Sequence, residues 1–311
     1  MVTPDDIVPC YDRAMTGRLF SRPFGWDDVE GLHLLMRAAP SDSKLGANAH
    51  IGHFYWGLRA TPNDDLMRDM RVWLDGASLA AVAWLDPPNS SDAIVAAGAD
   101  EDTLDDVIAW LEGAHHAGGS GPFAMMAQHG DTARIGLLRR RGYAPSAEGN
   151  VRFRRQLDSA PDALPLPQGF SLRHVANDDD IERRVRVETS AYGGLTTSVD
   201  RWRLLARRLP GYRPSLDLLA VASDGTGASA CTCWYDEANR RGEFEAVGTA
   251  KRFQQLGLGK AVITEGIRRL QQLGATEAIL YTSIGNAAAI ALYRSCEFEI
   301  VGEDYAWCKQ L

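Results

Sequence analysis

The sequence predicts a mixed α/β protein made of two domains in tandem. The chain has 311 residues, about twice the roughly 100–200 residues of one domain. Segments with strand patterns alternate with segments of helical periodicity along the chain. Between them, residues 158–168 contain Pro161, Pro165 and Pro167, which remove backbone donors and disfavour helix. We therefore expect one domain over residues 1–157, an extended linker over 158–168, and a second domain over 169–311.

The two halves share a faint internal repeat, which supports this division. Residues 71–86 and 218–236 each have the pattern of a strand, an Asp-Gly turn and a second strand. Farther along, Asp131–Tyr143 aligns without gaps with Asn286–Phe298, and an aromatic residue ends both segments. The shared order of hairpin, helix and Arg-rich helix end predicts a common architecture.

The second half can be divided into elements in order. Helices are indicated by acidic first turns, N-cap residues and glycine stops, and strands by short apolar runs. We expect strands at 170–174, 218–236 (a hairpin), 243–247, 278–282 and 298–307, and helices at 178–191, 198–209, 257–273 and 287–296.

Composition excludes several classes of protein. Apolar residues make up 45% and charged residues 24%, which is ordinary for a globular chain. The 33 basic and 41 acidic residues give a charge of −8, which argues against nucleic-acid binding. There is no secretory signal pattern, and no apolar run reaches the ~20 residues of a membrane helix. Five cysteines without a Cys-x-x-Cys pair predict neither disulfides nor a metal. We expect a cytoplasmic monomer or homodimer.

The most informative segment joins a strand that ends at Val247 to a long helix that opens at Gly257–Gly259. Glycines at such a junction let the backbone approach an anion, and the helix N-terminus suits phosphate. A Walker A loop would need glycine in place of Gln254 and a hydroxyl residue in place of Ala261. A dinucleotide fingerprint would need Gly or Ala in place of Val262. Both patterns fail.

The remaining pattern, Gln254-x-x-Gly257-x-Gly259, resembles the pyrophosphate arm of the GNAT superfamily of acyl-CoA N-acyltransferases. Its surroundings strengthen the resemblance: a strand precedes it, and a strand and a helix follow. That last helix opens with Asn286 and carries Tyr293 two turns later, so both lie on one face.

The resemblance covers nearly all of residues 169–311 and departs at Glu297, where the family usually has glycine. It implies two tandem GNAT-like domains. It also implies an acyltransferase of the EC 2.3.1 type that moves an acetyl group from acetyl-CoA directly to a primary amine of a small molecule or peptide.

The first half resembles the same fold in a decayed form. Asp131 and Leu138 stand where the second half has asparagine and tyrosine. Residues 97–103 contain no Gly-x-Gly arm, and the acidic run Asp100-Glu-Asp102 there would repel a pyrophosphate. We expect a partner domain without acetyl-CoA.

The resemblance also implies the cofactor contacts. The amides of Gln255–Lys260 would cradle the pyrophosphate. The Val247 amide would stabilise the oxyanion, and Gly248 and Thr249 would pair with the pantetheine arm. Asn286 would cap its helix and contact CoA. The predicted contacts are Val247, Gly248, Thr249, Gln254, Gln255, Leu256, Gly257, Leu258, Gly259, Lys260 and Asn286.

The candidate general acid is Tyr293, because a phenol of pKa about 10 is protonated at pH 7. The alternative is a tyrosine that packs its ring under the sheet. All seven histidines precede residue 175, so the base is sought among carboxylates. Period-2 alternation puts Glu243, Glu245 and Val247 on one face. Glu245 is then nearest the reacting carbonyl, as base directly or through a water, unless it is only a solvated or ion-paired strand residue.

Two other features are interpreted as structural. His50-x-x-His53 lacks the glutamate of a metalloprotease helix and is expected to hold ordinary histidines. The arginines between 183 and 208 are expected to form solvated helix faces.

Two functional alternatives stay open beside the N-acetyltransferase. One is a non-catalytic acyl-CoA-binding or sensor module. The other is an O-acyltransferase, or an enzyme that uses longer acyl chains. A mycothiol-synthase-like acetyltransferase is a specific version of the enzyme hypothesis, and no residue singles out its acceptor.

Overall fold

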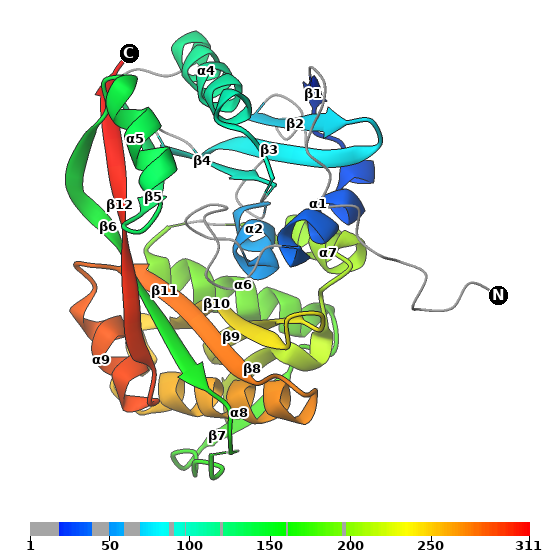
Figure 1. The fold of residues 1–311 in the computed structure, drawn as a ribbon. Helices are drawn as coiled ribbons and strands as arrows, with labels where there is room; N and C mark the ends of the chain where they lie inside the picture. Colours follow the sequence, from blue (N-terminus) through cyan, green and yellow to red (C-terminus); the bar gives the residue numbers. More distant parts are fainter. Residues whose placement is uncertain are drawn as a thin grey trace. The chain divides into compact units, whose positions relative to one another are not determined.

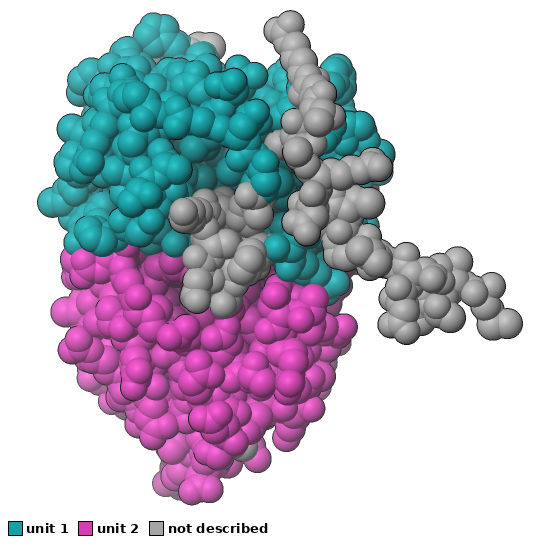
Figure 2. Space-filling model, viewed as in Figure 1, with its two compact units in different colours: residues 1–49, 64–149, 304–311 teal, residues 50–63, 150–303 magenta. Residues whose placement is uncertain are grey.

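The computed structural model describes residues 19–38, 50–58, 69–86, 90–96, 98–118, 121–159, 161–194 and 197–311. The chain divides into two compact units (Figure 2). Unit 1 comprises residues 1–49, 64–149 and 304–311, and unit 2 comprises residues 50–63 and 150–303. The units are thus interleaved along the chain, whereas the predicted domains follow one another; the functional division at 158–168 stays a prediction. No helix in the described ranges is long and apolar enough to span a bilayer.

Unit 1 is a mixed sheet packed against helices (Figure 1). Its sheet order is β1-β2-β3-β4-β5-β12, where β12 contributes residues 304–310; β4 and β5 run parallel and the other pairs antiparallel. Its core joins Val107 and Leu111 of α4 to Phe123 and Met125 of β5. The elements are β1 (Phe20–Pro23), α1 (Val29–Arg37), β2 (Met70–Asp75), β3 (Ser78–Asp86), β4 (Ser90–Val95), α4 (Glu101–Gly118), β5 (Pro122–Gln128), α5 (Thr132–Arg140) and the first part of β6 (Ala144–Gln156).

Unit 2 has the same plan and takes one helix from the first half of the sequence. Its sheet order is β6-β11-β10-β9-β8-β7, where β6 contributes residues 150–156; β10 and β11 run parallel and the other pairs antiparallel. The elements are α2 (Ile51–Leu58), β7 (Phe170–His174), α6 (Asp178–Tyr192), α7 (Val199–Arg208), β8 (Asp217–Ala222), β9 (Gly227–Asp236), β10 (Arg241–Thr249), α8 (Leu258–Gln272), β11 (Glu277–Ser283), α9 (Ala287–Ser295) and the first part of β12 (Glu299–Gln310).

Strand β9 shows which helices cover each face of the unit 2 sheet. Cys233 faces α8, since a Cβ on Gly266 of α8 would lie 2.6 Å from its Sγ. The residue before it on β9, Thr232, faces α6 and accepts a hydrogen bond from Arg184 (2.6 Å). Side chains alternate along a strand, so α8 and α9 cover one face and α6, α7 and α2 the other (Figure 1).

Most of the predicted elements are confirmed within one or two residues. The strand at Phe170–His174 is β7, and the helix expected at 257–273 is α8. Ser198 caps α7 by accepting a hydrogen bond from the Arg201 amide (3.1 Å). Glycines in the left-handed region make both Asp-Gly turns, with φ of 59° at Gly76 and 82° at Gly225.

The prediction of solvated arginine faces is wrong for two residues, Arg184 and Arg201, which are 1% and 7% exposed. Arg184 donates to Asp217 (2.9 Å) and Glu188 (2.7 Å), and its guanidinium lies 3.7 Å from the ring centroid of Trp202. Sequence spacing could not reveal that Arg184 is buried. The carboxylate that balances its charge, Asp217 on β8, lies 33 positions away in the sequence. A charged residue can be buried when it is paired in this way.

Candidate active site

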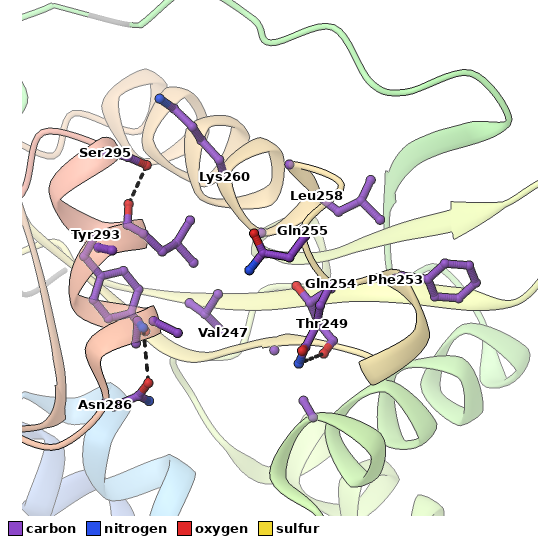
Figure 3. Close-up of a pocket in the computed structure, with 18 of the residues that line it drawn as sticks. Val247, Thr249, Phe253, Gln254, Gln255, Leu258, Lys260, Asn286, Tyr293 and Ser295 are labelled. Carbon is purple, nitrogen blue, oxygen red and sulfur yellow. Dashed lines mark hydrogen bonds between the residues drawn. The ribbon is translucent and has the colours of Figure 1, made fainter.

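A cavity of about 640 Å³ lies where β10 leads into α8 (Figure 3). It is lined by the end of α6, the end of β10, the loop before α8, and α9. Eleven residues predicted from the sequence line it: Val247, Gly248, Thr249, Gln254, Gln255, Gly257, Leu258, Gly259, Lys260, Asn286 and Tyr293. Two other predicted residues, Leu256 and Glu245, are not part of this lining. The structure thus brings the predicted residues together, while their contacts with a ligand stay predictions.

The N-terminus of α8 opens into this cavity and suits an anion. Gly257 caps the helix with φ of 78°, and Gln255 before it has φ of 63°. The first turn of α8 carries no acidic residue, so its free N–H groups and the positive end of the dipole are not neutralised from within the helix. Lys260 adds a positive charge to the lining.

A second glycine, Gly259, lets α8 and α9 approach each other. A Cβ there would lie 3.2 Å from Cδ2 of Leu292 and 3.4 Å from Oγ1 of Thr249. The first distance is short for a carbon contact and the second leaves no spare room, so the Leu292 side chain of α9 would have to shift for a larger residue. Gly259 therefore keeps the walls of the cavity in place.

Strands β10 and β11 separate at the cavity. They pair only through Arg241–Glu243 and Glu277–Ile279, although β10 continues to Thr249. Beyond that point β11 pairs with β6 on its other edge. The Val247 carbonyl accepts a hydrogen bond from the Tyr192 hydroxyl (2.9 Å). The predicted oxyanion role of Val247 depends on the separation of β10 from β11.

A bulge in β10 overturns one sequence prediction. Phe244 and Val247 both pair with cysteines of β9 that face α8, although three steps separate them on β10 and only two on β9. Glu243 therefore lies on the opposite face from Val247. The prediction that Glu243, Glu245 and Val247 share one face is wrong, because an extra residue in a bulge breaks the alternation.

Tyr293 is almost fully buried, 7% exposed, and its ring packs edge-on against Phe153 with centroids 5.5 Å apart. Burial raises the pKa of Tyr293 well above its usual value, and Tyr192 and Glu245 nearby raise it further. The phenol is therefore protonated at neutral pH. Both interpretations of this tyrosine, packing and proton donation, are compatible with its position, and the catalytic role stays a prediction.

The helix that carries Tyr293 is bounded by two informative residues. Asn286 caps it by accepting a hydrogen bond from the Ala289 amide (3.1 Å), and it also lines the cavity. After the helix, Glu297 has φ of 61° and forms an ion pair with Arg155 (2.7 Å). That left-handed conformation favours glycine, the residue from which Glu297 departs.

Helix α2 and the residue before it bring two histidines to β10. Nδ1 of His50 lies 2.7 Å from Oε2 of Glu243, and both side chains are buried. Gly52 makes this approach possible, since a Cβ there would lie 2.3 Å from Glu243 and 2.4 Å from Trp234. The pair and the glycine together hold α2 against the strand that leads to the cavity.

His53 stands one turn farther along α2. One of its nitrogens and a carboxylate oxygen from each of Glu243 and Glu245 all lie within 4.8 Å of one another. The search for a base by proximity in sequence set all histidines aside, but these two histidines lie beside Glu243 and Glu245, although neither lines the cavity. Residues 51–58 belong to unit 2 although they precede its other elements by more than ninety positions, and the sequence carries no signal of that placement.

Comparisons with known proteins bear on the second half of the chain most directly. Residues 192–298 match the Acetyltransferase (GNAT) family. The mycothiol acetyltransferase of Pseudarthrobacter chlorophenolicus is 31% identical over 67% of this chain and 62% of its own length. That of Paenarthrobacter aurescens is 33% identical over 55% of each chain. The chain thus spans little more than half the length of these relatives.

Solved structures bear on the fold of nearly the whole chain. A GCN5-related N-acetyltransferase from Sphaerobacter thermophilus superposes with a TM-score of 0.62 at 18% identity and covers 95% of this chain and 96% of its own. A tandem GNAT protein from the clavulanic acid biosynthesis pathway gives 0.66 at 15% identity and covers 94% and 98%. The predicted mixed α/β fold is confirmed. Residues 192–298 are an acetyltransferase domain of the GNAT family, in a chain that has the fold of a tandem GNAT protein.

Proposed function

We propose that this chain is an acetyl-CoA-dependent N-acetyltransferase that moves an acetyl group directly to the primary amine of a small molecule or peptide. The observation that carries the proposal is the cavity at the open N-terminus of α8, which a buried, protonated Tyr293 also lines. An anion site and a proton donor in one cavity are what transfer from a diphosphate-bearing thioester needs.

In this proposal each part of the site has one task. The amides of residues 255–260 hold the diphosphate, and the Val247 amide donates to the oxyanion that forms on the thioester carbonyl. Glu245 takes a proton from the acceptor ammonium. After the C–S bond breaks, Tyr293 gives its proton to the departing thiolate. The phenolate is then reprotonated by the nitrogen that has become part of the new amide.

The pKa of Tyr293 favours an enzyme over a sensor. Burial raises this pKa most, and the negative charge of Glu245 is among the groups that raise it further. A module that only binds acyl-CoA would need the α8 cradle alone, whereas an acid and a base on the two sides of one carbonyl serve a reaction.

The relatives support a finer candidate for the acceptor. Two of them, 31% and 33% identical to this chain, are named mycothiol acetyltransferase. We propose mycothiol that lacks its acetyl group as the first acceptor to test. The aligned regions leave much of each relative unmatched, so other amines belong in the same experiment.

The test is the release of free CoA thiol from acetyl-CoA with a panel of amines that includes des-acetyl mycothiol, amino acids, aminoglycosides and peptides. We expect turnover with at least one amine and an acetylated product of the corresponding mass. Tight acetyl-CoA binding without thiol release from any of them would contradict the proposal and favour the sensor.

A further inference from the structure

Helix α2 places an imidazole next to the carboxylate proposed as base. His53 is half-buried, and one of its nitrogens lies within 4.8 Å of a carboxylate oxygen of Glu243 and of Glu245 on β10. Tyr281 of β11 faces its ring edge-on, with centroids 5.9 Å apart. His53 therefore occupies the side of β10 that is opposite α8.

The other charged groups around His53 are already engaged. His50, the residue just before α2, has its Nδ1 2.7 Å from Oε2 of Glu243. Arg152 of β6 stacks on Tyr281, with its guanidinium carbon 5.6 Å from the centroid of the tyrosine ring. Glu243 is fully buried, whereas Glu245 is half-buried, so of the two carboxylates Glu245 is the one that can exchange protons with an acceptor.

We propose that His53 relays to solvent the proton that Glu245 takes from the acceptor ammonium. This inference rests on the proposed function. In each turnover one proton must leave the site: the ammonium loses it to the Glu245 carboxylate, and the free amine attacks the thioester. The neutral carboxyl passes the proton to the imidazole, and the imidazolium gives it to water. The carboxylate is then restored for the next acceptor.

The chemistry favours an imidazole in this place. Histidine is the side chain whose charge changes most readily near neutral pH, so it can both accept and release a proton there. A carboxyl that had to wait for water to enter between α2 and β10 would return to the ionised form more slowly. His53 is thus a positioning and relay residue, and Glu245 is the group that touches the acceptor.

The experiment compares His53→Gln with the wild type and with His174→Gln, a control that changes an exposed histidine on β7 of the same unit. We expect His53→Gln to lower kcat with the best amine about 10–100-fold at pH 7 and to leave the acetyl-CoA dissociation constant within twofold. The ratio of wild-type to variant kcat should increase as pH falls. His174→Gln should match the wild type in all three.

Chemical rescue separates a relay from a structural role. His53→Ala should regain several-fold in kcat when millimolar imidazole is added, and His174→Ala should not respond. Wild-type kcat and pH profile in His53→Gln would overturn the relay, as would a loss of activity in EDTA that zinc restores. If His53→Gln loses acetyl-CoA affinity because unit 2 is misfolded, the same measurements are made on His53→Asn instead. A wild type that releases no thiol with any amine overturns the proposed function instead.

Discussion

The strand-to-helix junctions of the two units differ in what fills the helix end. In unit 2, α8 begins at a left-handed glycine, carries no acid in its first turn and opens into a cavity of about 640 Å³. In unit 1, α4 begins with Glu101 and Asp102, and the Asp100 carboxylate accepts hydrogen bonds from the Thr103 amide (2.8 Å) and hydroxyl (2.6 Å). Corresponding helix ends thus differ: the end of α8 leaves its N–H donors open to the cavity, and Asp100 satisfies donors at the end of α4.

The helices that follow show the same contrast. Asn286 caps α9 and Asp131 caps α5, each by accepting from an amide three residues on (3.1 and 3.0 Å). Seven residues after these caps, α9 has Tyr293 and α5 has Leu138, which is fully buried. The cap is needed for the helix and is present in both units, whereas the hydroxyl is needed only for the proposed chemistry and is present in one.

Removing the hydroxyl from unit 2 should have the largest effect. We expect Tyr293→Phe to lower kcat about 100–1,000-fold, because a general acid contributes on this scale, with the acetyl-CoA dissociation constant within about twofold. Steady-state thiol release measures it. The matched control is Tyr143→Phe, which removes a buried hydroxyl from unit 1 and should leave kcat unchanged. An equal decrease in kcat in the two variants would contradict the proposed difference between the units.

Giving α8 the charge of α4 should have the next largest effect. Gly257→Glu places a carboxylate at the helix end and strains a backbone with φ of 78°. We expect acetyl-CoA affinity to fall about 100-fold, which corresponds to roughly 2.7 kcal/mol, by calorimetric titration. Gly113→Glu in α4 introduces the same charge where a Cβ meets nothing within 4 Å, and affinity should stay the same. Unchanged acetyl-CoA affinity in Gly257→Glu would contradict the proposal that the N-terminus of α8 binds the diphosphate.

Removing the carboxylate that fills the end of α4 should have the smallest effect. The Thr103 hydroxyl and amide, as hydrogen-bond donors, lower the pKa of Asp100 below its usual value. Because the folded pKa is the lower one, the carboxylate stabilises unit 1 above the unfolded value of about 4 and loses this effect as pH falls through the folded value.

We therefore expect Asp100→Ala to cost about 1 kcal/mol in the free energy of unfolding at pH 7, and the difference from wild type to shrink below about pH 4. Chemical denaturation at several pH values checks it. A constant difference down to acid pH would show that the charge of Asp100 contributes nothing.

Local structure was largely predictable from the sequence. Caps, glycine stops and Asp-Gly turns are short-range signals, and they placed α8, β7 and both hairpins within one or two residues. The residues around the cavity were predictable for the same reason, since Gln254 to Lys260 form one continuous segment.

Three features were not predictable, and each depends on distant contacts. The bulge between Phe244 and Val247 changes a face by inserting one residue, which leaves the apolar pattern almost unaltered. The burial of Arg184 on α6 depends on Asp217 of β8. His53 reaches Glu245 only because α2 packs on β10, and a search for a base by proximity in sequence excluded it.

The exchange of segments between the two units has a consequence for synthesis. β5 of unit 1 pairs with residues 304–310, and the unit 2 sheet needs residues 150–156 beside β11 and α2 against β10. Domains generally fold in the order in which a ribosome makes them, but here the strand that completes the earlier unit is translated after almost all of the later one. Unit 1 must remain unfinished, with an open sheet edge, throughout that interval. A nascent chain of this kind would depend on chaperones during translation more than two consecutive, self-contained domains would.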